Sequence, residues 1–180
     1  MFKIRKATLV DAPAIAAVHV TAWREAYRGI ISDEFLANLS LQRRTQFWVN
    51  SLSDPSHIFH HVFVAESNGQ VVGFAGYGIP QEKESGFDGE LFAIYILQSA
   101  QKRGIGRLLV NQVVEVMRDI GWNSMVVWVL KDNPARGFYE RLGGEYLLEK
   151  QIEIGGDSLV ETAYGWRDLS RFRGGEGVQR

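Results

Sequence analysis

The sequence predicts a single α/β domain, a three-layer sandwich of helices around one mixed, mostly antiparallel sheet of six to seven strands. Three observations predict it. The 180 residues fit one compact domain, and a hydrophobic share of 46% is ample for a core. The apolar pattern also changes period along the chain, from helical to alternating, with a strand–helix–strand unit in the middle. We expect this domain to cover residues 1–169 and residues 170–180 to form a flexible tail.

The first 60 residues predict one strand followed by helices. A strand is expected over residues 2–7, where apolar and basic side chains alternate. Thr8, with Asp11 three residues later, is typical of a helix start, and apolar residues at helical spacing extend that helix to about Tyr27. Gly29 ends it. Shorter helices are expected from Ser32 and over residues 41–52.

A hairpin and a buried strand follow. Asn68-Gly69 is a strong hairpin signal between strands expected at residues 61–65 and 70–79. Residues 80–89 are polar and contain glycine, which predicts a loop. Residues 90–97 are almost wholly apolar, so we expect a strand that is buried on both faces.

The second half predicts the rest of the sheet. After a glycine-containing segment comes a helix with Leu108, Leu109, Val113 and Val116 on one face, and then a buried strand at residues 125–130. The unit 90–130 should therefore be parallel and right-handed. A short helix is expected over residues 134–142, and a terminal hairpin pairs residues 145–154 with 158–166.

Composition excludes several classes of function. The net charge of −1 lacks the basic footprint of a nucleic-acid binder. The absence of cysteine excludes disulfides, thiolate zinc sites and a cysteine nucleophile. No signal peptide or membrane-length apolar run is present, so we expect a soluble cytoplasmic protein without a membrane partner. His57, His60 and His61 have no supporting ligands, and we expect no metal.

The segment Gln101-Lys102-Arg103-Gly104-Ile105-Gly106 lies between a buried strand and a helix. Glycines let the backbone approach a ligand, and exposed amides at a helix start favour an anion. Lys102, Arg103 and Arg107 add positive charge, so a pyrophosphate is the natural occupant. An ordinary helix start with two glycines is the alternative for this hexapeptide taken alone.

Two other nucleotide motifs fit this segment badly. A P-loop needs Gly-x4-Gly-Lys-Ser/Thr, and neither that spacing nor the hydroxyl is present. The dinucleotide fingerprint needs a third small residue where Leu109 stands. It also needs an acidic residue at the end of the next strand, and none comes before Asp132.

The pattern Gln-x-x-Gly-x-Gly resembles the pyrophosphate-binding signature of the GNAT superfamily of N-acetyltransferases. Two flanking segments strengthen the resemblance: the preceding strand Leu91-Phe92-Ala93-Ile94-Tyr95-Ile96, and the segment Asn133-Pro134-Ala135-Arg136-Gly137-Phe138-Tyr139. Together the motifs span residues 2–166 in the family order. The resemblance implies the acyl-CoA N-acyltransferase fold and acetyl-CoA as co-substrate.

The resemblance also implies roles for particular residues. A bulge in the family's strand frees backbone groups for the pantetheine arm, which would here belong to Ile94, Tyr95 and Ile96. Asn133 would precede a short helix whose Tyr139 faces the thioester sulfur. One departure is the spacing of six residues from Asn133 to Tyr139, where many members have seven, so the contact of Asn133 is less firmly assigned.

Acetylation of an amine by direct attack needs an uncharged amine, a polarised carbonyl and a proton for the leaving thiolate. Tyr139, protonated at neutral pH, is the candidate general acid, or else a core aromatic. Glu90, at the start of the central strand, is the candidate base, or else a solvated strand-end carboxylate. Asp88 and Glu25 compete with it.

The resemblance implies that the first two helices wall the acceptor pocket. Trp23 and Tyr27 are candidate substrate-binding residues, with core packing as the alternative. The leading hypothesis is acetylation of a small-molecule primary amine. Acetylation of a protein N-terminus or lysine is a second hypothesis, and a non-catalytic coenzyme-binding module is a third. The terminal hairpin could pair two copies into a homodimer.

Overall fold

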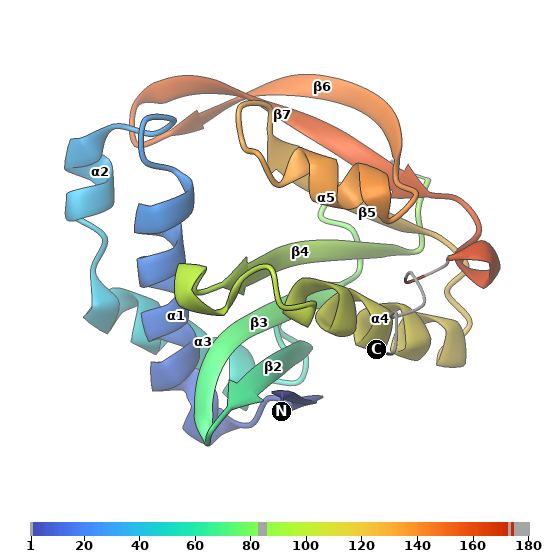
Figure 1. The fold of residues 1–180 in the computed structure, drawn as a ribbon, viewed down its shortest axis with the longest axis horizontal. Coiled ribbons are helices and arrows are strands. Elements are labelled where there is room, and N and C mark those ends of the chain that lie inside the picture. The colour runs from blue at the N-terminus through green and yellow to red at the C-terminus, as the bar shows by residue number, and fades with distance from the viewer. Residues whose placement is uncertain (1, 83–85, 173, 175–180) are drawn as a thin grey trace.

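The computed structural model describes residues 2–82, 86–172 and 174, and its seven strands form a single sheet (Figure 1). The strand order is β1-β2-β3-β4-β5-β7-β6. In the described residues, every neighbouring pair is antiparallel except β4 with β5, which is parallel. The strands are β1 Phe2–Lys6, β2 Val62–Ser67, β3 Gln70–Gly78, β4 Gly89–Ile96, β5 Met125–Leu130, β6 Glu145–Ile154 and β7 Asp157–Trp166. The predicted mixed, mostly antiparallel sheet is confirmed.

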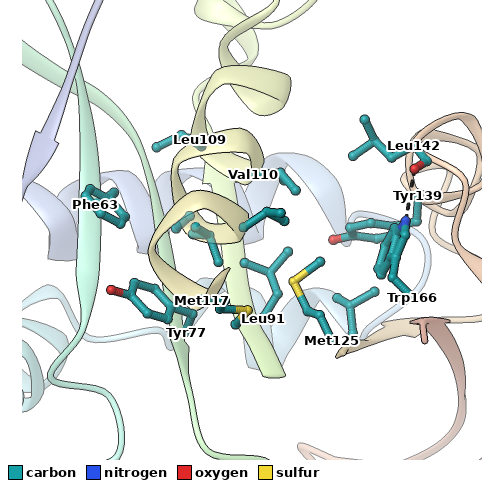
Figure 2. Close-up of a cluster of buried hydrophobic side chains, with 14 of the residues drawn as sticks. Phe63, Tyr77, Leu91, Leu109, Val110, Met117, Met125, Tyr139, Leu142 and Trp166 are labelled. Atoms are coloured by element: carbon teal, nitrogen blue, oxygen red, sulfur yellow. Dashed lines mark hydrogen bonds between the residues drawn. The ribbon is translucent and has the colours of Figure 1, made fainter. Parts of the chain in front are cut away.

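Helices cover both faces of the sheet, which gives the predicted three layers. On one face lie α1 (Ala12–Ala26), α2 (Asp33–Ala37) and α3 (Leu41–Ser53). On the other lie α4 (Ile105–Asp119) and α5 (Arg136–Arg141), packed on the largest buried cluster (Figure 2). The described residues also contain the 3-10 turns η1 Leu9–Asp11, η3 Gln98–Ala100 and η4 Leu169–Arg171.

Local chemistry fixes the first helix against the sheet. The Asp11 carboxylate accepts the backbone N–H of Thr8 at 2.7 Å, the reciprocal contact that the sequence spacing predicts. Asp11 also pairs with Arg5 at 2.8 Å, and Arg5 reaches Glu66 at 2.6 Å. The hydrogen bond from Arg5 is the main cause that lowers the pKa of Asp11 to about 2. The start of α1 is thereby tied to β1 and β2.

Arg24 ties the other end of α1 to α2. Its guanidinium donates to the carbonyl oxygens of Leu36 at 3.0 Å, Ala37 at 3.3 Å and Leu39 at 3.0 Å. These carbonyls lie at the end of α2, where helical partners are missing. Helix α2 is therefore held in place although it has only five residues.

Two predictions of burial were wrong in part. Leu108 is 44% exposed, because the face of α4 toward the sheet consists of Ile105, Leu109, Val110, Val113, Val114 and Met117. Strand β4 was expected to be buried on both faces, but its residues are only half-buried from Phe92 onward. The neighbouring strand β5 leaves β4 at that point, so one edge is uncovered.

Described residues continue past the expected boundary at residue 169. Turn η4 extends to Arg171, and the Phe172 ring packs against Trp166 with centroids 6.0 Å apart. Of the expected tail, residues 173 and 175–180 lie outside the described residues. Within the described part of the chain, none of the helices has both the length and the apolar character needed to cross a membrane.

Candidate active site

Strands β4 and β5 pair over three residues and then separate. Gly89, Glu90 and Leu91 are opposite Met125, Val126 and Val127, and no further pairs join the two strands in the described residues. Strand β4 nevertheless continues to Ile96 and β5 to Leu130. Beyond Leu91, the β5-facing edge of β4 therefore has no strand partner. An extended ligand could pair with these backbone groups as a further strand would.

A bulge in β4 lies at the start of this separation. On the β3 side, Tyr77 is opposite Leu91 while Gly76 is opposite Ala93, so Phe92 is the extra residue. A bulge bends a strand and interrupts its ladder. The predicted residues Ile94, Tyr95 and Ile96 lie beyond the bulge, on the part of β4 that β5 has left.

The glycine segment closes the open end of this gap. Gly104 is the N-cap of α4 with φ +84°, a left-handed conformation that favours glycine. Lys102 is also left-handed, with φ +59°. A Cβ at Gly106 would lie 3.2 Å from the Phe138 ring, so the first turn of α4 packs closely on α5. The first amides of α4 have no partner within the helix, and a helix start of this kind favours an anion.

Two side chains of this segment have structural contacts. Gln101 donates its amide to the carbonyl of Ile96 at 2.9 Å, which ties the segment to the end of β4. The Arg103 guanidinium lies 4.6 Å from the centroid of the Phe2 ring. Of the remaining predicted coenzyme residues, Lys102 lies in the connection between η3 and α4, and Ile105 and Arg107 lie in the first turn of α4.

Tyr139 lies on α5 and is 5% exposed. Figure 2 shows its hydroxyl pointing into the cluster, toward α4 and the strands. Among the described residues no hydrogen bond to this hydroxyl is found, so it is available to a ligand. Burial raises the pKa of Tyr139 well above the ordinary value, which keeps the phenol protonated.

Asn133 was predicted to contact the coenzyme, and the structure shows that it also has a local structural role. Its side-chain oxygen accepts the backbone N–H of Ala135 at 2.9 Å and so organises the turn before α5. Burial raises the pKa of Tyr27, and the nearby Asn133 side chain acts in the opposite direction. The residue thus connects the α5 turn with α1.

Glu90 lies on the opposite face of the sheet from Tyr139. Its neighbour Leu91 packs in the α4 cluster, and successive side chains of a strand point to opposite faces. Glu90 is only 4% exposed, and its carboxylate accepts the backbone N–H of Gln81 at 2.9 Å. Burial is the main cause that raises its pKa. Such a shift moves a carboxylate toward the range of a general base, and the solvated strand-end alternative is wrong.

A charged cluster that the sequence reasoning missed adjoins Glu90. Lys150 forms ion pairs with Glu82 and, at 3.8 Å, with Glu161. Its ammonium also lies 3.8 Å from the centroid of the Trp128 ring. Burial is the main cause that raises the pKa of Glu161. The hairpin pattern of the sequence could have predicted that Lys150 and Glu161 are opposite each other, as they are. It could not have predicted that Lys150 lies near Glu90.

Asp88 and Glu25, the two other candidate bases, accept hydrogen bonds from backbone amides of neighbouring loops. Asp88 accepts backbone amides of Asn123 at 2.8 Å and Ser124 at 3.1 Å. These contacts lower its pKa. Glu25 accepts the backbone amide of Gln98 at 2.9 Å. Neither carboxylate has the burial of Glu90.

Aromatic side chains line the α1 side of the gap. The hydroxyls of Tyr27 and Tyr95 are 3.1 Å apart, and the rings of Trp23 and Tyr27 are 4.9 Å apart. Tyr27 is buried in a hydrophobic cluster, so it does have the packing role of the alternative interpretation. The Trp23 indole N–H is buried, and none of the residues that the structure describes accepts a hydrogen bond from it. The sequence had predicted Tyr95 for its backbone alone.

His19 is a second residue that sequence reasoning missed, although its spacing from Trp23 placed it on the same helix face. Its ring stacks on Tyr95 with centroids 5.0 Å apart. Trp48 donates its indole N–H to His19 Nδ1 at 3.2 Å. Burial is the main cause that lowers the pKa of His19 to about 3, so the imidazole is neutral.

A metal site was not predicted. Within residues 2–82, 86–172 and 174, no three His, Cys, Asp or Glu side chains are grouped so as to hold an ion. His60 and His61 lie side by side, with ring centroids 5.4 Å apart, and the His61 ring stacks on Tyr77.

Comparisons with known proteins agree with this geometry. Residues 15–144 match the model of the Acetyltransferase (GNAT) family. The chain is 38% identical over 174 residues to the uncharacterized N-acetyltransferase YuaI of Bacillus subtilis, with 96% of this chain and 97% of that protein covered.

Two solved structures share the fold. One is a ribosomal-protein-alanine N-acetyltransferase from Brucella melitensis, with TM-score 0.68 and 28% identity over 91% of this chain and 98% of that one. The other is yncA from Salmonella typhimurium with its cofactor acetyl-CoA, with TM-score 0.67 and 22% identity over 93% of this chain and 94% of that one.

Proposed function

Because the chain belongs to the GNAT family of acetyltransferases, we propose that it moves an acetyl group from acetyl-CoA to the primary amine of a small molecule by direct attack. One observation carries the proposal. The gap between β4 and β5 has a buried carboxylate at its closed end and the N-terminus of α4 at its open end. A long ligand with an anionic group and a reactive end matches this arrangement.

The open end binds the coenzyme in this proposal. The amides at the start of α4 bind the diphosphate, with Lys102, Arg103 and Arg107 adding positive charge. Gln101 and Gly106 position this turn through Ile96 and Phe138. The backbone of Ile94, Tyr95 and Ile96 pairs with the pantetheine arm, and Asn133 contacts it from the α5 turn. The thioester then reaches the closed end of the gap.

The closed end carries the acid–base chemistry in this proposal. Glu90 removes the proton of the ammonium group, directly or through water, and the amine nitrogen attacks the thioester carbonyl. The oxyanion donor expected near Ile96 lies at the open end with the pantetheine contacts, so a backbone N–H at the bulge near Phe92 stabilises the developing oxyanion. The carbon–sulfur bond breaks, and Tyr139 donates its proton to the leaving sulfur. Acid and base thus act from opposite faces of the sheet.

The raised pKa of Tyr139 sharpens its role. A phenol that is a weaker acid than usual does not release its proton readily. It still donates a hydrogen bond to a developing thiolate, and such a bond to a charged sulfur is stronger than one to a neutral acceptor. Stabilisation of the leaving group is therefore the main contribution of Tyr139.

The acceptor approaches from the α1 face in this proposal. Trp23 and Tyr27 form its aromatic wall, and Lys150, which pairs with Glu161, is close enough to Glu90 to act on its pKa. These side chains come from α1, β6 and β7. A small amine is the acceptor that we propose for them.

Acetylation of a protein N-terminus is the second candidate, favoured by the name of the Brucella melitensis relative. A thiol-release assay with acetyl-CoA distinguishes the two classes. Small amines, amino acids, polyamines and aminoglycosides form one panel, and peptides with free N-termini form the other. Turnover confined to peptides contradicts the small-molecule proposal. Coenzyme binding without release of thiol by any acceptor or by water indicates a non-catalytic module.

A further inference from the structure

A cavity of about 330 Å³ lies between the three helices of the α1 face. Helix α1 contributes one wall residue, α2 one, α3 three, and the connection between α2 and α3 the rest. The lining residues are Val20, Phe35, Asn38, Leu39, Ser40, Arg43, Arg44 and Phe47. Two of them are arginines and none is acidic. The cavity is therefore strongly positive, in a chain whose net charge is −1.

Arg44 is the half-buried cation of this cavity. Its guanidinium lies 5.5 Å from the centroid of the Phe47 ring, and no carboxylate or carbonyl pairs with it among the described residues. The arginines on neighbouring elements differ, because Arg5 has two carboxylate partners and Arg24 has three carbonyl partners. A cation that loses water without gaining a partner costs free energy. A ligand anion would offset that cost.

The cavity borders the acceptor face of the gap. The ring of Phe35, which lines it, is 6.4 Å from Trp23, and Trp23 is 6.3 Å from Tyr95. Arg44 is also close enough to His19 to contribute to the lowering of its pKa. His19 stacks on Tyr95, whose hydroxyl meets that of Tyr27. The Arg44 guanidinium is therefore near the aromatic side chains that adjoin the gap.

We propose that Arg44 binds a carboxylate of the acceptor, so that the preferred substrates are small primary amines that also carry a carboxylate. The inference rests on the proposed function and deepens it. A guanidinium matches a carboxylate with two parallel hydrogen bonds, and the cavity volume suits a short chain. The amine extends past Trp23 to the thioester while the carboxylate stays at Arg44.

Matched acceptors test this assignment. The kcat/KM for ω-amino acids of increasing length is compared with that for n-alkylamines of the same length. For the length that fits, we expect the carboxylate to raise kcat/KM about 10- to 100-fold, the range of a hydrogen-bonded charge pair. The Arg44→Met variant keeps the apolar stem over Phe47 and should lose this preference through KM. Arg44→Lys should restore part of it.

Lys3→Met is the matched charge control. Lys3 is exposed on the edge strand β1, so its loss removes one positive charge far from the cavity and should leave the preference unchanged. Equal kcat/KM for acids and alkylamines in the wild type overturns the assignment of Arg44 while acetyl transfer itself stands. Failure to acetylate any amine or peptide overturns the proposed function as well.

A binding measurement tests the same inference without turnover. In the presence of coenzyme A, calorimetry with N-acetyl-ω-amino acids should detect association with the wild type and at least about tenfold weaker association with Arg44→Met. The matching N-acetyl-alkylamines should bind both proteins alike. Equal affinity of the acids for the two proteins overturns the proposal.

Discussion

The two halves of β4 differ in their strand pairing and in their burial. Its first residues, Gly89 to Leu91, pair with β3 or β5 and are buried. Its last residues pair with β3 alone and are half-buried. The first part, which pairs with β5, stabilises the sheet and contains Glu90. The last part has no strand partner on its β5 side, and there we propose that the coenzyme binds. Substitutions in the closed half should therefore affect stability or chemistry, and those at the open end should affect coenzyme binding.

The largest expected effect is at Glu90. Glu90→Gln should lower kcat about 100-fold or more, because a general base contributes on the order of 10²–10⁴. In the wild type, kcat should rise with pH through the raised pKa of Glu90, and the variant should lose that limb. An unchanged pH–rate profile would remove Glu90 as the base.

The same variant has a stability signature. The folded-state pKa of Glu90 is raised, so its contribution to stability is complete below the unfolded pKa and is lost as pH rises through the folded pKa. Glu90→Gln should therefore raise the free energy of unfolding at alkaline pH relative to the wild type. Urea unfolding at several pH values measures this difference, and a variant destabilised at alkaline pH contradicts it.

The next effect concerns packing at the closed half. A Cβ at Gly89 would lie 2.8 Å from both Met117 and Trp122. Gly89→Ala should lower the free energy of unfolding by about 1–3 kcal/mol, the range for overpacking. Gly76→Ala is the control, because its Cβ would meet its nearest atom only at 3.9 Å. Equal stability of the two variants contradicts the tight packing of β4 on α4.

The expected effect of substituting Tyr139 is smaller than that at Glu90 and larger than that at the open end of β4. Tyr139→Phe should cut turnover at least about tenfold with little change in coenzyme affinity, because only a proton or hydrogen-bond donor is lost. Tyr77→Phe, buried in the same cluster, should retain turnover. Steady-state kinetics and calorimetry measure both quantities, and unaltered turnover in Tyr139→Phe removes the assignment.

The smallest expected effect is at the open end. Gly104→Ala places alanine at φ +84°, which costs about 1–2 kcal/mol, and should weaken coenzyme binding several-fold. Gly121→Ala is closely matched, since Gly121 has φ +85°, open space around it and a place just beyond α4. It should carry similar strain without weakening coenzyme binding. Equal coenzyme affinity in the two variants contradicts the role of the α4 start.

The sequence predicted best what short-range chemistry determines. Asn68-Gly69 forms the expected turn with both φ values positive, and Gly104 begins α4 because only a left-handed residue fits there. The sequence predicted burial least well where burial depends on which neighbouring strands separate. The half-burial of β4 and the exposure of Leu108 follow from the departure of β5 and the rotation of α4. Neither the half-burial of β4 nor the exposure of Leu108 can be predicted from the residues next to it in the sequence.

The same reason explains the missed residues of the site. Arg44 and Lys150 occupy ordinary positions on an amphipathic helix and a strand. Their importance arises because no anionic group pairs with Arg44 in the described part of the chain and because Lys150 lies beside Trp128 and Glu161. Such relations join residues far apart in the chain, so a single sequence does not reveal them.

A titration monitored by amide ¹H–¹⁵N spectra tests the central claim most directly. Coenzyme A should shift the amides of Gly104, Ile105 and Gly106 together with those of Ile94, Tyr95 and Ile96. Pantetheine, which lacks the diphosphate, should shift the β4 amides alone. Saturable shifts that leave the start of α4 untouched, or no shifts at millimolar coenzyme, would contradict the account.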